Sequence, residues 1–134
     1  MYKRTYANLS SIVYDASVAA EATAKLAPKA SPITREDALK TGADFATLVR
    51  EKIDPNALIF IFGSTVKGEA NINSDIDIAV ITEVYGNDVM SAYVALSMLA
   101  NEVSWDIEIH AVAPIDWQRG DPHVLEIKKW GVPA

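Results

Sequence analysis

The sequence contains no cysteine among its 134 residues. This absence excludes disulfide bonds, zinc sites built from cysteine and any enzyme mechanism that uses a thiol nucleophile. A surplus of basic residues is also missing, since the formal net charge is −6 and the pI is about 4.8. We therefore expect no broad basic surface for nucleic acid, although a few donors and metal ions could still hold a single nucleotide.

Long apolar runs are absent as well, and none approaches the roughly 20 residues that a membrane span needs. Residues 1–22 begin with basic residues and contain small ones, as secretory signals do. However, Asn8, Ser10, Ser11 and Asp15 interrupt the apolar part of this segment. We therefore expect an ordinary N-terminal helix, a cytoplasmic protein and no membrane partner.

The length favours a single domain over 1–134, and a 50% share of hydrophobic residues is enough for a real core. Apolar spacing and turn residues predict helices over 7–27, from Thr34 to about 53, over 88–101 and over 122–130, and strands over 57–62, 75–82 and 103–112. This order predicts an α+β fold (an α/β sandwich), with a small mixed sheet flanked by helices.

Two acidic residues stand in the strand expected over 75–82. Asp75 and Asp77 share one face of that strand, where like charges repel each other and Asp is unfavourable. Glu108 and Asp106 share a face of the next expected strand. If the two strands are neighbours, three or four carboxylates converge, and such oxygen clusters suit two Mg²⁺ ions, with Mn²⁺ as the alternative metal.

A turn rich in small residues precedes these aspartates. Gly63 and Ser64 follow the apolar run 57–62, and Lys67 comes shortly after them. A glycine lets backbone N–H groups approach an anion closely, and a helix start or a nest of amides binds phosphate. Each motif alone is weak evidence, but a phosphate cradle beside a carboxylate pair indicates phosphoryl or nucleotidyl transfer.

At this point the chain resembles a known family. The segment GSTVKGEANINSDIDIAV (63–80) is similar to the signature of the DNA polymerase beta nucleotidyltransferase superfamily. The small size resembles the minimal nucleotidyltransferases of bacteria and archaea, many of which pair with a HEPN-type helical partner in toxin–antitoxin operons. The resemblance implies the nucleotidyltransferase fold, with a catalytic core over 57–117 and residues 1–35 as a helical N-terminal extension.

The resemblance also implies roles for residues. Asp75 and Asp77 would bind two metal ions, and Gly63 and Ser64 would hold the β- and γ-phosphates of a nucleoside triphosphate. Lys67 and Ser74 are further candidates for phosphate contacts.

A third acid on the later strand would bind a metal and help to deprotonate the acceptor. The order Ile107-Glu108-Ile109-His110 favours Glu108 over Asp106, and this choice stays open. His110 could touch substrate or metal, but we expect it first as a polar strand residue at the rim of the site, and we expect His123 on the surface.

The implied activity is transfer of a nucleoside monophosphate, with ATP favoured as donor, to a hydroxyl group. A partner protein is the expected acceptor, because few residues follow Trp117 to form a second substrate domain. The alternative is an antitoxin-like module that neutralises a HEPN-type partner by docking, without essential catalysis. The apolar N-terminal helices also suggest a homodimer.

Overall fold

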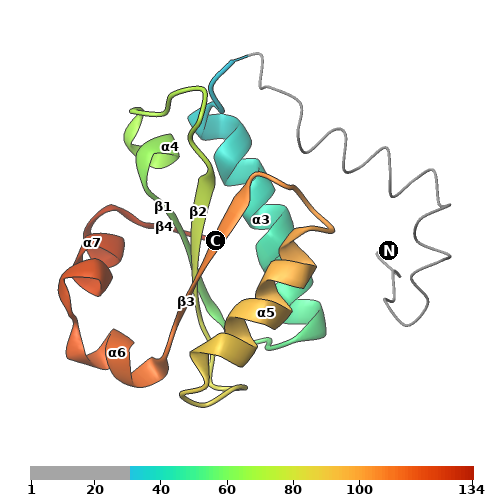
Figure 1. Cartoon of the computed structure of the whole chain (residues 1–134), viewed down its shortest axis with the longest axis vertical. Coiled ribbons are helices and arrows are strands. Elements are labelled where there is room, and N and C mark those ends of the chain that lie inside the picture. The colour runs from blue at the N-terminus through green and yellow to red at the C-terminus, as the bar shows by residue number, and fades with distance from the viewer. Residues whose placement is uncertain (1–30) are drawn as a thin grey trace, which may run out of the picture. The chain divides into compact units, whose positions relative to one another are not determined.

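The computed structural model describes residues 31–134. In chain order they form α3 (Arg35–Lys52), β1 (Leu58–Phe62), α4 (Ser64–Lys67), β2 (Ile76–Ile81), α5 (Val89–Ala100), β3 (Ile107–Val112), α6 (Pro114–Arg119), α7 (Pro122–Trp130) and β4 (Val132–Pro133) (Figure 1). The predicted α+β class is confirmed, since helices pack on a four-stranded mixed sheet.

The strand order in the sheet is β3-β2-β1-β4. Strand β1 runs antiparallel to both β2 and β4, whereas β2 and β3 are parallel. Two parallel neighbours need a crossover connection, and α5 supplies it. As a result, β2 and β3 begin at the same end of the sheet, where β1 finishes.

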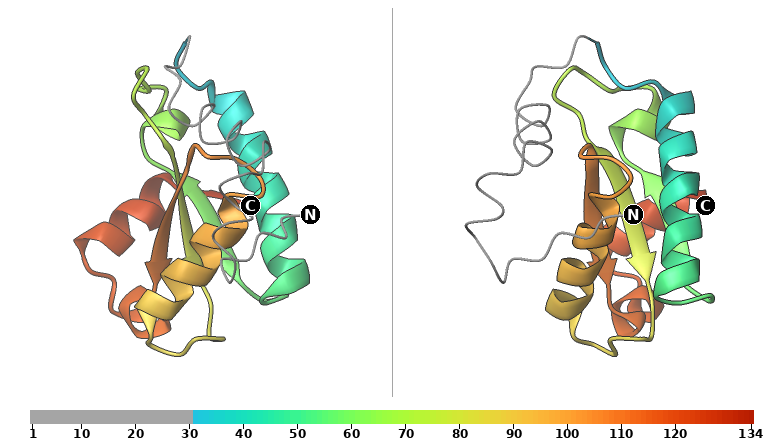
Figure 2. Two further views of the ribbon diagram at one scale, coloured as in Figure 1. Left: turned by 45° about the vertical axis from the view of Figure 1, so that its right-hand side comes forward. Right: turned by 90° about the vertical axis from the view of Figure 1, so that its right-hand side faces the viewer.

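Helices α3 and α5 cover one face of the sheet, as Figure 1 shows, and the right panel of Figure 2 turns this face toward the viewer. Phe45 and Val49 of α3 and Leu96 of α5 are fully buried there, against Ile61 and Ile78 of the central strands. Because β1 and β2 are covered on both faces, they read in the sequence as nearly continuous apolar runs.

Helices α6 and α7 lie over the opposite face (Figure 1). Val124 and Ile127 of α7 pack there with Ile81 and Val112 in a second, smaller core cluster. The Asp121 side chain caps α7 by accepting a hydrogen bond from the backbone N–H of Val124. This second core does not reach the first residues of β2 and β3. Polar side chains occupy the sheet face there.

One predicted strand is shorter than expected. Strand β3 begins at Ile107, whereas the alternating pattern predicted a start at residue 103. The backbone N–H groups of Val103 and Ser104 donate to the Ala100 carbonyl, which closes the end of α5 as a turn. Local hydrogen bonds therefore outweigh the alternation of side chains in this stretch.

Two elements were not predicted. Helix α6 starts at Pro114, a residue that favours the first turn of a helix, but at six residues it is too short to show a helical period. Strand β4 is only two residues long and pairs with β1 at Phe60 and Ile61. The helix predicted over 7–27 lies outside the described residues.

No helix within residues 31–134 is both long enough and apolar enough to cross a membrane.

A buried polar contact joins the end of α3 to the end of β2. The Thr82 hydroxyl donates to Asp54 Oδ2 at 2.6 Å, and the backbone N–H of Asn56 donates to Asp54 Oδ1 at 2.8 Å. Asp54 is 9% exposed and Thr82 is 5% exposed. Two donors at this buried corner therefore depend on one carboxylate.

Asp54→Ala should lower the free energy of unfolding by about 1–3 kcal/mol, because it leaves the buried Thr82 hydroxyl without its acceptor. Urea denaturation at neutral pH measures this change. The matched control is Asp44→Ala, whose carboxylate lies on the surface of α3 beside Lys40 and should contribute no more than about 0.5 kcal/mol. Equal losses in the two variants would contradict the role of the buried contact.

Candidate functional site

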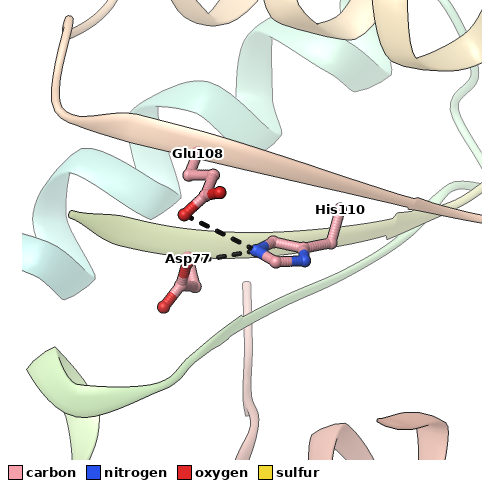
Figure 3. A group of neighbouring side chains, drawn as sticks. All are labelled: Asp77, Glu108 and His110. Atoms are coloured by element: carbon pink, nitrogen blue, oxygen red, sulfur yellow. Dashed lines mark hydrogen bonds and ion pairs between the residues drawn. The ribbon is translucent and has the colours of Figure 1, made fainter.

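The parallel pairing of β2 with β3 places two carboxylates beside each other. Asp77 is the register partner of Glu108, and both side chains leave the sheet on the face that α6 and α7 partly cover. Figure 3 shows the two carboxylates on neighbouring strands, directed to the same side. The expectation that acidic residues of these two strands meet is therefore confirmed for this pair.

An imidazole completes this group. His110, two residues after Glu108 on β3, has its Nε2 at 3.1 Å from Asp77 Oδ1 and at 4.0 Å from Glu108 Oε2 (Figure 3). The separation from Asp77 is within hydrogen-bonding range, with the tautomer of the imidazole deciding which group donates. One ligand atom from each of the three residues lies within 4.8 Å of the other two.

Aromatic rings hold the imidazole in place. The ring of Phe62, on β1, meets the His110 ring edge-on with 4.8 Å between centroids. The ring of His123, in the first turn of α7, lies 5.5 Å from His110 and 5.8 Å from Phe62. Residues from β1, β3 and α7 thus surround the group that includes Asp77.

The predicted phosphate turn touches the same carboxylate. Gly63 has φ 83° and ψ −161°, a conformation that is open almost only to glycine. A Cβ built at Gly63 would collide with Asp77 Oδ2. The glycine is therefore required twice, once for the backbone angle and once for the space that the carboxylate of Asp77 occupies.

Of the other predicted phosphate ligands, Ser64 and Lys67 lie in α4 after this turn and Ser74 lies in the loop before β2, and two of the three have partners. Ser64 begins α4 directly after Gly63. The Ser74 hydroxyl accepts the backbone N–H of Asn71 and so helps to shape the loop before β2. The Lys67 ammonium donates to Glu126 of α7 at 2.9 Å.

Two predicted acids lie outside the three-residue group. Asp75 precedes the first residue of β2 and is exposed, but its charge is close enough to raise the pKa of Glu108. Asp106 precedes β3, and its backbone carbonyl accepts the N–H of Ile76. Of the two candidates for the third acid, the structure brings Glu108 to Asp77 and does not bring Asp106 into the group.

The nearby negative charges affect the pKa of Glu108. A hydrogen bond shared with Asp77 is the main reason why the pKa of Glu108 is raised above its ordinary value. Partial burial and the negative charges of Asp77 and Asp75 raise this pKa further, while His110 opposes them. Because the carboxylates repel each other when ionised, a bound cation would stabilise their ionised forms.

The donor set fits a divalent metal ion. Asp77 and Glu108 offer carboxylate oxygens, the ligands that Mg²⁺ and Mn²⁺ prefer, and His110 adds a nitrogen. The missing side chain of Gly63 keeps the space beside Asp77 clear. This arrangement can bind an ion and place the anionic group of a ligand against the turn at 63–64.

The proximity of His110 to Asp77 was not predicted, because the sequence-based interpretation placed this residue at the rim. The alternation of side chains along β3 could have predicted this proximity, since a residue two positions after Glu108 must share its face. The contact of Glu126 with Lys67 was also missed. The two residues are 59 positions apart in the chain, and no local sequence pattern predicts such a pair.

Comparison with known proteins agrees with this geometry. Residues 44–128 match a family described as Nucleotidyltransferase domain. The match spans more than half of the chain and includes Gly63, Asp77, Glu108 and His110. None of the curated proteins matches the chain.

Gly63→Ala should be much more destabilising than Gly68→Ala. Both glycines have positive φ, but Gly68 lies in the left-handed helical region, where another residue costs about 1–2 kcal/mol, whereas the conformation of Gly63 is open almost only to glycine. Only at Gly63 does the new methyl group also collide with Asp77, whereas nothing lies within 4 Å of a Cβ at Gly68. Urea denaturation of the two variants measures the difference, and equal losses would contradict both the backbone cost and the steric cost assigned to Gly63.

Glu108→Gln should raise stability at neutral pH in the presence of a chelator. Because the folded pKa is raised, the contribution of Glu108 to stability is present below its unfolded pKa of about 4.3 and is lost as pH rises through the folded value. The advantage of the variant should therefore grow between pH 4 and pH 8, as urea denaturation would show.

Glu126→Gln is the matched control with the opposite sign. The Lys67 ammonium lowers the pKa of Glu126, so its stabilising contribution is present above about pH 4.3 and is lost as pH falls through the folded value. This variant should be less stable than the unsubstituted protein at neutral pH, and the deficit should shrink toward acid. Changes of the same sign in both variants would contradict the assignment.

Proposed function

We propose, from the premise that this chain belongs to the nucleotidyltransferase domain family, that it transfers a nucleoside monophosphate from a nucleoside triphosphate to a hydroxyl group and releases pyrophosphate. ATP is the donor that we propose first. The observation that carries the proposal is the contact between Gly63 and Asp77, because it joins the phosphate turn to the carboxylate group at one point of the sheet.

The chain's own residues would divide the work between binding and orientation. Asp77 and Glu108, with Asp75 beside them, would hold two divalent cations at the start of β2 and β3. When bound, these cations neutralise the triphosphate and lower the pKa of the acceptor hydroxyl. Gly63 and Ser64 would hold the β- and γ-phosphates, so that the α-phosphorus faces the acceptor for in-line attack.

Glu108 is the residue that we assign to the acceptor. Its side chain is 57% exposed and lies beside Asp77, so it can take the hydroxyl proton as the new ester bond forms. The attacking oxygen gains the α-phosphoryl group, and the bond to the β-phosphate oxygen breaks. Pyrophosphate then leaves from the turn at Gly63 and Ser64.

Lys67 and Ser74 would complete the phosphate contacts. For Lys67 this requires an exchange of partners, because its ammonium would release Glu126 to reach a phosphate oxygen. The side chain of Lys67 is 23% exposed and that of Glu126 is 52% exposed, so water can replace the lost partner of Glu126. The Lys67–Glu126 pair would then mark the nucleotide-free state.

The exposure of the site supports a large acceptor. The Glu108 side chain is 57% exposed, and Asp75 also lies at the surface. A hydroxyl group on a folded partner protein can approach these residues without any opening of the fold. We therefore propose a protein acceptor, and a helical protein of the HEPN type is the first candidate.

Labelling with each of the four nucleoside triphosphates, carrying the label on the α-phosphate, tests this function. The purified full-length chain is incubated with a divalent cation and a lysate of its native host. Label should appear on a discrete acceptor, and Asp77→Asn should reduce it at least about 100-fold, because a charge-stabilising group of the site is lost.

The matched control is Asp44→Asn, which makes the same chemical change on the outer surface of α3 and should label normally. If no nucleotide labels any acceptor under conditions where a known transferase works, the transfer proposal is wrong. A module that neutralises its partner by docking would then be the function to test, and Asp77→Asn should leave such neutralisation intact.

A further inference from the structure

We propose that His110 is a direct metal ligand, and that its nitrogen makes the site prefer Mn²⁺ over Mg²⁺. This inference rests on the proposed function only in taking Asp77 and Glu108 as ligands of the same cation. It adds a nitrogen donor to a set of carboxylates, and it names the chemical consequence of that donor.

The distances among the three side chains suit a shared ion. In an octahedral site with bonds of about 2 Å, adjacent ligand atoms lie about 3 Å apart and opposite ones about 4 Å apart. His110 Nε2 lies 3.1 Å from Asp77 Oδ1 and 4.0 Å from Glu108 Oε2. An ion bound between these atoms would take the place of the Nε2 proton, with little movement of the ring.

The surroundings of the ring favour a fixed ligand over a mobile surface histidine. The His110 side chain is 27% exposed, and the edge of Phe62 and the ring of His123 pack beside it. In Figure 3 the ring extends from β3 toward the two carboxylates. A ligand that is held in its binding position before the ion arrives loses little conformational freedom on binding.

The identity of the donor atom determines the selectivity. Mg²⁺ is a hard ion that takes oxygen ligands and gives up its water reluctantly. Imidazole nitrogen is a better ligand for transition metals, and carboxylate oxygens suit both ions. A site of two carboxylates and one imidazole therefore gains more affinity for Mn²⁺ than for Mg²⁺, relative to a site with oxygen ligands alone.

A simpler explanation is that His110 only donates a hydrogen bond to Asp77 and orients it. The two roles differ in one measurable respect. A hydrogen-bond donor outside the coordination sphere affects both ions in the same direction, whereas a nitrogen ligand changes the ratio of the two affinities and couples magnetically to bound Mn²⁺.

The test uses the full-length chain after removal of metal by a chelator, with Mn²⁺ alone as the probe. Electron paramagnetic resonance of free Mn²⁺ gives its dissociation constant, and competition gives that of Mg²⁺. Pulsed spectra of bound Mn²⁺ report whether a nitrogen is coordinated. The variants are His110→Gln, which replaces the nitrogen with an amide oxygen, and His123→Gln, which changes the neighbouring ring outside the group.

The unsubstituted protein and His123→Gln should show nitrogen coupling and a preference for Mn²⁺. His110→Gln should lose the coupling, and its Mn²⁺ affinity should fall by more than the roughly 10-fold that loss of an outer-shell partner costs, with a smaller change for Mg²⁺. Bound Mn²⁺ without nitrogen coupling in the unsubstituted protein would overturn the proposal, and so would an unchanged affinity ratio in His110→Gln. The spectrum of the unsubstituted protein decides the question even if the variant fails to fold.

The outcomes also separate this inference from the proposed function. Nitrogen-coupled Mn²⁺ in a protein that labels no acceptor would uphold the metal ligand and contradict the transfer activity. Labelling that depends on Asp77, with a Mn²⁺ to Mg²⁺ ratio that His110→Gln leaves unchanged, would uphold the activity and contradict the role of His110.

Discussion

The parallel pairing of β2 with β3 is the constraint on which the rest of the structure depends. It places Asp77 directly beside Glu108, and two positions later along β3 it brings His110 to the same face. Parallel pairing requires a crossover, which explains the position of α5. A shift of β3 by one residue would turn Glu108 and His110 to the apolar face under α3 and α5 and leave Asp77 behind, so the hydrophobic core itself holds the polar group in place.

The group is also a concentration of unfavourable charge that the fold tolerates at one end of the sheet. The neighbouring carboxylates raise the pKa of Glu108, and only a glycine at position 63 leaves room for the side chain of Asp77. Such local conflicts are typical of functional sites, where neighbouring structure compensates for them. Here His110 opposes the negative charges that act on Glu108, and His123 of α7 packs beside the His110 ring.

Much of the site could be predicted because its parts are close together in the chain. Gly63, Ser64, Asp75 and Asp77 fall within 15 consecutive residues that run from the end of β1 into β2, and the family model covers the same stretch. The choice between Glu108 and Asp106 could not be made from the pattern, since both residues have the same parity and only the start of β3 separates them. The roles of His110 and Glu126 depend on which elements become neighbours, which is a property of the tertiary structure.

The contact of Gly63 with Asp77 has a thermodynamic consequence. A Cβ at Gly63 would collide with Asp77, so the backbone that would hold an anion runs close to the carboxylate that would hold a cation. At so short a separation the two bound charges would attract each other, and binding of the two ligands would be linked. Linkage is reciprocal: whatever factor a bound cation applies to the affinity of the turn for phosphate, bound phosphate must apply to the affinity for the cation. A single glycine thereby brings the two halves of the site close enough for such linkage.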